Sequence, residues 1–261
     1  MVAMLAMMVP PGLRAQGGAN LVATTSVPTA TAQILISTDG TTTVSARAVD
    51  YAGNASPLIT TTVQLDQTAP TISISVPEAR DYLQGETIAA QYTCADEGSG
   101  VARCEGSLPN GAVIDTTTVG ERSFTVAAED VAGNLAEQTV TYRVIYRFQG
   151  FFAPVENPPS LNQVQAGRAV PLKFRLGGDQ GLNVLAPGSP RSVAIACDTT
   201  APIAGAEATI TAGASELSYD PVSDQYTYVW KTDKQWAGGC RQLVLQLADG
   251  TVHRANFRFR D

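Results

Sequence analysis

The chain has 261 residues, of which 44% are hydrophobic and 16% are charged, and its formal net charge is −7 at pH 7. A charged fraction well below the roughly 25% of ordinary domains excludes a highly charged disordered chain and a coiled coil. Lysine and arginine form no basic stripe and no apolar run approaches the roughly 18 residues of a membrane span, so we expect neither a nucleic-acid partner nor a membrane-spanning protein.

The spacing of apolar residues predicts β-strands. The longest stretches free of both Gly and Pro, 134–149 and 222–237, have 16 residues each. Both alternate with a period of two and are rich in β-branched and aromatic residues, which is typical of half-buried strands. The alternating positions are Val140, Tyr142, Val144, Tyr146 and Phe148, and then Tyr226, Tyr228 and Trp230. We predict an all-β protein of tandem immunoglobulin-like antiparallel β-sandwich modules.

Residues 1–19 are interpreted as a signal-like or disordered segment. The apolar stretch Met1 to Val9 is followed by Pro-Pro-Gly, which resembles the core of a secretory signal. A basic region before that core and a clean Ala-x-Ala cleavage site are both missing. A truncated signal and a start inside a longer reading frame are both open.

An internal repeat is the most informative feature of the sequence. Residues 39–56 align without a gap on residues 119–136, at an offset of 80 residues. Each copy is an alternating strand that ends in Asp, followed by a tight Ala-Gly-Asn turn and a second strand. Gly53 and Gly133 supply the positive φ that such a turn needs. This period in an all-β chain predicts an array of small sandwiches.

The turn residues are Asp50, Gly53 and Asn54 in the first copy and Asp130, Gly133 and Asn134 in the second. At these positions the sequence resembles the bacterial immunoglobulin-like repeats of surface proteins, which carry A-x-D-x-A-G-N near their end. Residues 66–72, Asp-Gln-Thr-Ala-Pro-Thr-Ile, look like the linker that opens the next module. The resemblance implies a partial module at 20–67 and a complete one at 68–147. By the repeat arithmetic a complete first module would begin before Met1, so we expect its early strands to be missing.

Two roles are open for Asp50 and Asp130. Each carboxylate can accept backbone N–H bonds from the turn that follows it, which is the interpretation we favour. The alternative makes them calcium ligands, but one carboxylate per turn is far short of the roughly 6 to 8 oxygens that calcium gathers. We predict no metal site and no cofactor.

A different domain is predicted at 148–261. Pro-rich sequence begins after Arg147, and the A-x-D-x-A-G-N motif does not recur beyond it. This region resembles the PxKF domain of secreted bacterial proteins, whose motif stands here as Pro171-Leu172-Lys173-Phe174. The family carries no established catalytic residues, and the strand pattern predicts a β-sandwich. Further matching residues include Tyr219, Asp220, Tyr228, Trp230, Trp236 and Cys240.

The last two strands predict a hairpin of defined register. Leu243, Leu245 and Leu247 share one parity with His253 and Phe257. A three-residue loop at 248–250, with Gly250 in the left-handed conformation, sets Leu245 opposite His253 and keeps charge out of the core. We therefore interpret His253, the single histidine of the chain, as a packed residue near a sheet margin.

No catalytic pattern stands out. One histidine cannot form a His-based metal site, and the sequence has no Gly-x-Ser-x-Gly elbow, Walker loop or His-Glu-x-x-His motif. We predict that the protein is not an enzyme.

The four cysteines predict two disulfides. Cys94 and Cys104 flank an Asp/Gly/Ser loop and can meet across a hairpin, while Cys197 and Cys240 lie at the ends of two strands of one sandwich. Disulfides imply an extracellular setting. Four buried thiols are the alternative.

Four aromatic residues of the last domain allow a binding role. Exposed, coplanar rings of Tyr226, Tyr228 and Trp230, with Trp236 nearby, would form a glycan-binding surface. The interpretation we favour makes them core, because period-two spacing is what a buried sheet face produces.

These observations predict a secreted or cell-surface bacterial protein, non-catalytic and modular, that serves as a structural stalk, presentation or adhesion segment of a larger extracellular protein. Its expected partners are other extracellular modules of the same polypeptide or surface, and possible polysaccharide. The alternative function is an accessory carbohydrate-binding module appended to an extracellular hydrolase.

Overall fold

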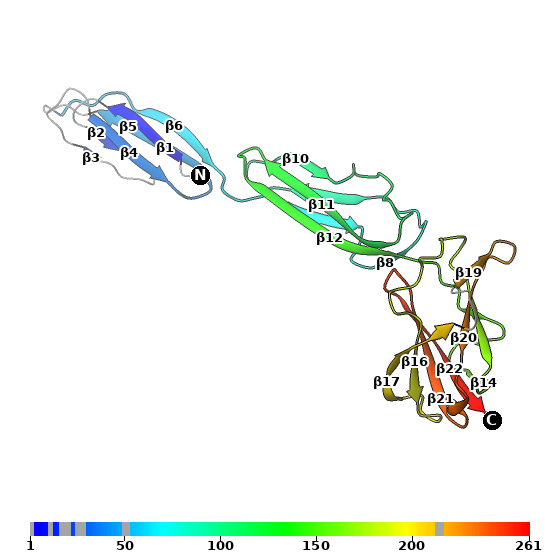
Figure 1. Ribbon diagram of the computed structural model, residues 1–261. Helices are drawn as coiled ribbons and strands as arrows, with labels where there is room; N and C mark the ends of the chain where they lie inside the picture. The colour runs from blue at the N-terminus through cyan, green and yellow to red at the C-terminus, as the bar shows by residue number, and fades with distance from the viewer. Residues whose placement is uncertain (1–2, 10–12, 16–21, 24–29, 49–52, 212–216) are drawn as a thin grey trace. The chain divides into compact units, whose positions relative to one another are not determined.

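The computed structural model describes residues 3–9, 13–15, 22–23, 30–48, 53–211 and 217–261. These residues form β-strands, with one short 3-10 helix, η1 (Lys234–Trp236) (Figure 1). The all-β prediction is confirmed. Contacts divide the chain into two compact units, the first made of Met1–Val76, Ala90–Gly111 and Thr125–Thr139, the second of Pro77–Ala89, Ala112–Phe124 and Val140–Asp261.

The first strands of the chain form two sheets. One pairs β1 (Ala3–Val9) with β4 (Ala30–Ile36), and the other has the order β3 (Val22–Ala23), β2 (Leu13–Ala15), β5 (Gly40–Ala48) and β6 (Ile59–Leu65). Ile34, Ile36, Val44 and Leu65 form a buried cluster. Part of the segment interpreted as signal-like is therefore strand, since β1 pairs along its whole length with β4.

The middle strands also form two sheets. A two-stranded sheet pairs β7 (Thr71–Val76) with β9 (Gln91–Ala95). The second sheet has the order β10 (Val101–Gly106), β11 (Gly120–Asp130), β12 (Leu135–Ile145) and β8 (Asp81–Leu83). Every second residue of β11 from Phe124 to Asp130 is buried, which confirms the predicted alternation.

The terminal domain contains two five-stranded sheets around one core. The first follows the order β13 (Phe151–Phe152), β15 (Ala169–Phe174), β20 (Gln225–Lys231) and β18 (Ile210–Thr211), with β19 (Leu217–Asp220) also on β20. The second follows the order β14 (Leu161–Gln165), β22 (Val252–Arg260), β21 (Cys240–Gln246), β16 (Arg191–Ile195) and β17 (Pro202–Ala208). The largest fully buried side chains include Trp230, Tyr226, Phe174, Phe257 and Phe259.

Two strand pairs correct the prediction of purely antiparallel pairing. β8 pairs with β12, and β14 pairs with β22, in parallel. Both β8 and β14 are edge strands that lie far in sequence from their partners, so no hairpin fixes their direction.

The C-terminal hairpin has the predicted register. Leu245 pairs with His253 and Leu243 with Ala255. The Leu247 N–H donates to the Thr251 carbonyl at 2.9 Å, which leaves the three-residue loop 248–250. Gly250 has φ +85°, the left-handed conformation that the loop requires.

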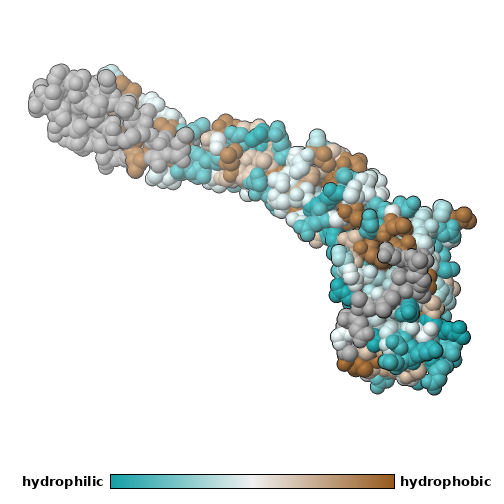
Figure 2. Space-filling view, viewed as in Figure 1, coloured by the Kyte–Doolittle hydropathy of each residue, from teal (hydrophilic) through white to brown (hydrophobic). Residues whose placement is uncertain are grey.

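The surface mixes hydrophilic and hydrophobic residues on the face shown in Figure 2. Among exposed large apolar side chains are Val222, at 95% exposure, and Ile203, at 69%. Within the described residues, no helix has the length and apolar character needed to cross a membrane.

Candidate functional site

The turn after β11 is built around Asp130. Its side chain is 1% exposed and accepts the Asn134 backbone N–H at 2.8 Å and the Asn134 Nδ2–H at 2.7 Å. Gly133 has φ +87° and Gly53 of the first copy has φ +90°. The turn-capping role of Asp130 is confirmed, whereas Asp50 lies outside the described residues.

Asp66 and Asp96 approach Asp130 from two other loops of the first unit. One carboxylate oxygen from each of the three residues lies within 4.8 Å of the others. Asp66 accepts the Ser99 N–H at 2.6 Å and the Thr68 N–H at 3.1 Å. A hydrogen bond from the Ser99 side chain, as the largest cause, holds the pKa of Asp66 below its usual value, and the Thr68 and Ser99 N–H bonds act in the same direction.

Beside these carboxylates lies a cleft of about 700 Å³ whose lining includes Asp39, Asp66 and Asp96. Asp96 accepts the Gly98 N–H at 3.1 Å and the Gly100 N–H at 2.7 Å, both through its Oδ2. Three carboxylate oxygens can attract a cation but are fewer than the roughly 6 to 8 ligands of calcium. The arrangement directly joins three loops, because the Asp66 carboxylate accepts the Ser99 N–H and the Asp66 carbonyl accepts the Asn134 Nδ2–H at 3.1 Å.

Sequence reasoning missed this convergence. Asp66 and Asp96 lie 64 and 34 residues before Asp130, so spacing along the chain does not reveal their proximity. Two sequence signals could have revealed the convergence: the Asp-Gln-Thr-Ala-Pro linker and the Asp/Gly/Ser loop. Both would have had to be assigned to the end of the sandwich that carries the Ala-Gly-Asn turn.

The rings proposed for glycan binding are core residues. Tyr226 and Trp230 are 0% exposed and Tyr228 is 5% exposed. Tyr226 stacks on Phe174 with ring centroids 5.4 Å apart. The core interpretation is confirmed, and the sugar-stacking role of these three rings is wrong, because the inward face of β20 supplies the bulk that fills this domain.

One face of the Trp236 ring is covered, and Trp236 also lines a cleft of about 370 Å³. Trp236 is half-buried, the Arg241 guanidinium lies 4.0 Å from its ring centroid, and the Trp230 ring packs 5.6 Å away. Arg241 also donates to the Ser192 hydroxyl at 3.1 Å, which holds the guanidinium in place. The contribution of Trp236 to a binding surface stays a prediction.

Buried tyrosine hydroxyls have polar partners. The Tyr226 hydroxyl accepts the Gln180 N–H at 2.6 Å, and the Tyr228 hydroxyl lies 2.7 Å from the Thr209 hydroxyl. Burial, as the largest cause, raises the pKa of Tyr226 to about 12. These hydroxyls anchor loops and stay protonated at neutral pH.

The Pro171, Lys173 and Phe174 positions lie on β15. Leu172 and Phe174 are 0% exposed, whereas Pro171 and Lys173 occupy the other face and are half-buried. The motif therefore follows the alternation of a strand that packs one face into the core.

Both predicted disulfides are present. Cys94 joins Cys104 with Cα atoms 5.9 Å apart, and Cys197 joins Cys240 with Cα atoms 5.3 Å apart. The first disulfide corrects the expectation of a bond across a hairpin, because β9 and β10 belong to different sheets and do not form a hairpin. It connects the two sheets of the middle module.

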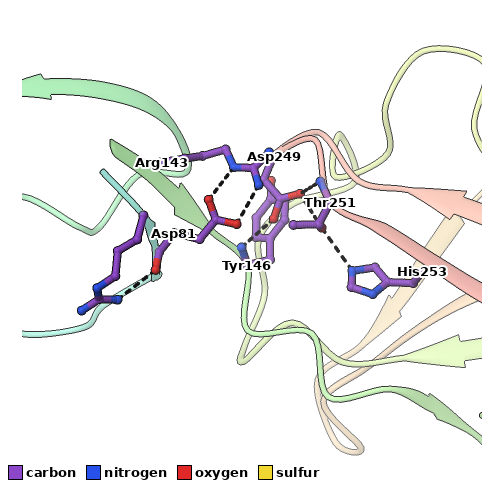
Figure 3. A network of polar contacts seen from close by, with 7 residues as sticks. Asp81, Arg143, Tyr146, Asp249, Thr251 and His253 are labelled. Atoms are coloured by element: carbon purple, nitrogen blue, oxygen red, sulfur yellow. Dashed lines mark hydrogen bonds and ion pairs between the residues drawn. The ribbon is translucent and has the colours of Figure 1, made fainter. Parts of the chain in front are cut away.

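His253 is packed, as expected, within a polar network (Figure 3). Its ring stacks on Phe148 with centroids 3.5 Å apart, and its Nε2 lies 3.1 Å from the Thr251 hydroxyl. Burial, the largest cause, lowers the pKa of His253. In the same network Asp81 accepts two hydrogen bonds from Arg143, at 3.0 and 2.7 Å.

No protein-family model matches the chain, and a search of curated proteins finds no match. Among solved structures, the fibronectin(III)-like modules of Clostridium thermocellum CbhA are 15% identical, with 73% of this chain and 94% of that chain covered and a TM-score of 0.26. The protocadherin GammaB4 extracellular domain is 12% identical over 98% of this chain and 43% of that chain, with a TM-score of 0.33.

A third similar structure is the Bacteroides ovatus protein SGBP-B in complex with a mixed-linkage heptasaccharide. It is 11% identical over 73% of this chain and 48% of that chain, with a TM-score of 0.23. This chain spans less than half the length of the second and third structures. All three TM-scores are low, so the function is argued from the residues of this chain.

Proposed function

We propose that the protein is a non-catalytic, secreted or cell-surface bacterial β-protein that acts as a structural stalk, presentation or adhesion segment of a larger extracellular protein. In this proposal 20–67 is a partial immunoglobulin-like module, 68–147 is an immunoglobulin-like module and 148–261 is a PxKF domain. The observation that carries it is that the side chains considered for catalysis or binding have structural roles. Asp130 caps a turn, His253 is half-buried and stacks on Phe148, and the aromatic residues of β20 are buried.

The disulfides support the location. Each unit contains one, Cys94–Cys104 in the first and Cys197–Cys240 in the second. Disulfides persist in oxidising compartments and are rare in the cytosol. Their presence favours an extracellular module over an intracellular one.

The alternative, an accessory carbohydrate-binding module, loses its main support with the burial of Tyr226, Tyr228 and Trp230. Sugar stacking needs an exposed ring face, and these rings have none. Partners of the stalk are other extracellular modules of the same polypeptide or surface.

Two assays test the proposal. The purified chain should turn over no ester, glycoside, phosphate or peptide substrate. It should also migrate in native gels at the same rate with and without embedded soluble polysaccharides. Turnover that survives repurification and disappears on mutation of one carboxylate would contradict the non-catalytic role. Retardation by a polysaccharide would favour the carbohydrate-binding alternative.

A further inference from the structure

The terminal domain packs around the end of the strand that leads into it. β12 ends at Ile145, and Tyr146 is 7% exposed within the same buried cluster as Phe174 and Trp230. Phe148 packs against that cluster and stacks on His253. The hydrophobic core of the second unit therefore includes side chains of the incoming segment 146–148.

Polar contacts hold the backbone of this segment. The Asp249 carboxylate, 4% exposed, accepts the Tyr146 N–H at 2.7 Å. The same carboxylate accepts the Thr251 N–H at 2.8 Å and the Thr251 hydroxyl at 2.7 Å, which fixes its direction. Figure 3 shows Asp249 between Tyr146 and Thr251. A buried N–H without a partner is costly, so this carboxylate favours the docked segment.

A third contact holds the middle of the segment. Arg147 donates through Nε to the Gln84 carbonyl at 2.7 Å, and Gln84 donates through Nε2 to the Gln180 side chain at 2.8 Å. The segment that crosses the predicted domain boundary is thus contacted on its backbone, on both aromatic side chains and on its arginine.

We propose that the 248–250 loop and His253 form a docking surface for the segment Tyr146–Phe148, so that this segment and the terminal domain move as one body and do not hinge at the boundary. The surface suits an extended segment with one inward backbone N–H and aromatic side chains at alternate positions. The proposal goes beyond the proposed function, because it holds whichever partner the protein presents.

The wild-type chain gives the first test, because Arg147 places a trypsin site in the middle of the segment. We expect the folded chain to resist cleavage after Arg147 and the Tyr146 amide to be protected from hydrogen exchange. Rapid cleavage after Arg147 together with an unprotected Tyr146 amide would overturn the proposal, whatever the variants do.

Variants give the second test. Phe148→Ala and Asp249→Ala should each speed cleavage after Arg147 by about tenfold, the effect of one lost contact of this kind. The matched control is Asp198→Ala, since exposed Asp198 accepts the Thr199 N–H of its own turn, at 2.8 Å. Tryptophan emission, from buried Trp230 and neighbouring Trp236, reports whether the core stays folded. Equal cleavage rates in all four proteins would refute the docking surface.

If Asp249→Ala unfolds the hairpin, Phe148→Ala decides the question alone, because it leaves the contacts between Asp249 and Thr251 in place. Faster cleavage in Phe148→Ala with unchanged tryptophan emission supports docking. Unchanged cleavage in that variant contradicts it.

Discussion

At the scale of single residues, buried carboxylates in this protein serve as acceptors for backbone N–H groups. Asp130 and Asp249 each accept N–H bonds within their own turn. The role of Asp130 could be predicted from sequence, because the donor follows it by four residues. The bond from the Tyr146 N–H to Asp249 could not, since 103 residues separate donor and acceptor.

Asp130→Ala should destabilise the first unit by about 1–3 kcal/mol, because it removes the buried acceptor of the part-buried Asn134 N–H. Urea unfolding monitored by circular dichroism measures the change, with Asp198→Ala as the exposed control. Equal midpoints for wild type and Asp130→Ala would show that the turn holds without its carboxylate.

Stability should also depend on His253. Burial sets the folded-state pKa of His253 below its ordinary 6.5, Arg254 lowers it further, and Asp249 opposes the shift. Between the two pKa values the unfolded chain binds a proton that the folded chain does not. The free energy of unfolding should therefore fall as pH drops below 6.5, by at most about 1.4 kcal/mol per pH unit.

Denaturant midpoints between pH 7.5 and 5 in steps of about half a unit measure this slope. His253→Gln should remove it, because glutamine does not titrate. The nearby carboxylate Asp81, whose pKa is lowered by its hydrogen bond to Arg143, titrates below this range. The same slope in wild type and His253→Gln would assign the effect to other groups.

At the scale of elements, the sequence predicted which faces of the strands are buried. It did not predict which loops come together. The parity of β20 and β22 correctly predicted buried Tyr226, Trp230 and Phe257, because alternation is a local property of the chain. The meeting of Asp66 with Asp96 depends on how sheets are ordered in space, which local spacing does not encode.

The converging loops should respond to divalent cations. Asp66, Asp96 and Asp130 place three like charges within 4.8 Å of one another, and a cation drawn to them offsets their repulsion. We expect calcium to raise the thermal midpoint more than sodium chloride of equal ionic strength, and Asp96→Asn to reduce that difference. Identical midpoints in the two salts would show that N–H donors alone offset the repulsion.

Alternation along β15 predicts opposite outcomes for adjacent substitutions. Phe174→Ala removes a fully buried ring and should cost about 3–5 kcal/mol. Lys173→Ala changes the half-buried face and should cost less than about 1 kcal/mol. Urea unfolding of the two variants checks this order. A larger loss from Lys173→Ala would mean that the lysine has a role beyond the strand's outer face.

At the scale of the whole molecule, the two disulfides stabilise different units. The closed loops have sequence separations of 10 and 43 residues. Chain-entropy arguments give contributions of about 2.8 and about 4 kcal/mol, before native strain. Reduction of the disulfides should therefore lower the temperatures of two unfolding transitions independently. The larger decrease is expected for the second unit.

Calorimetry of Cys94→Ser/Cys104→Ser and Cys197→Ser/Cys240→Ser double variants assigns each transition to its bond. Each variant should shift one transition and leave the other at the wild-type temperature. A joint shift of both transitions by either variant would show that the units unfold as one.

The parallel pair of β14 with β22 sets the order of events during synthesis. Leu161 pairs with Asn256, so about a third of the chain must be synthesised after β14 before its partner strand is available. β22 also brings Phe257 and Phe259 into the core. The terminal domain therefore cannot complete its fold on the ribosome until its last strand has emerged. A nascent chain that is still unfolded at that stage is the form that a translocation pore can thread.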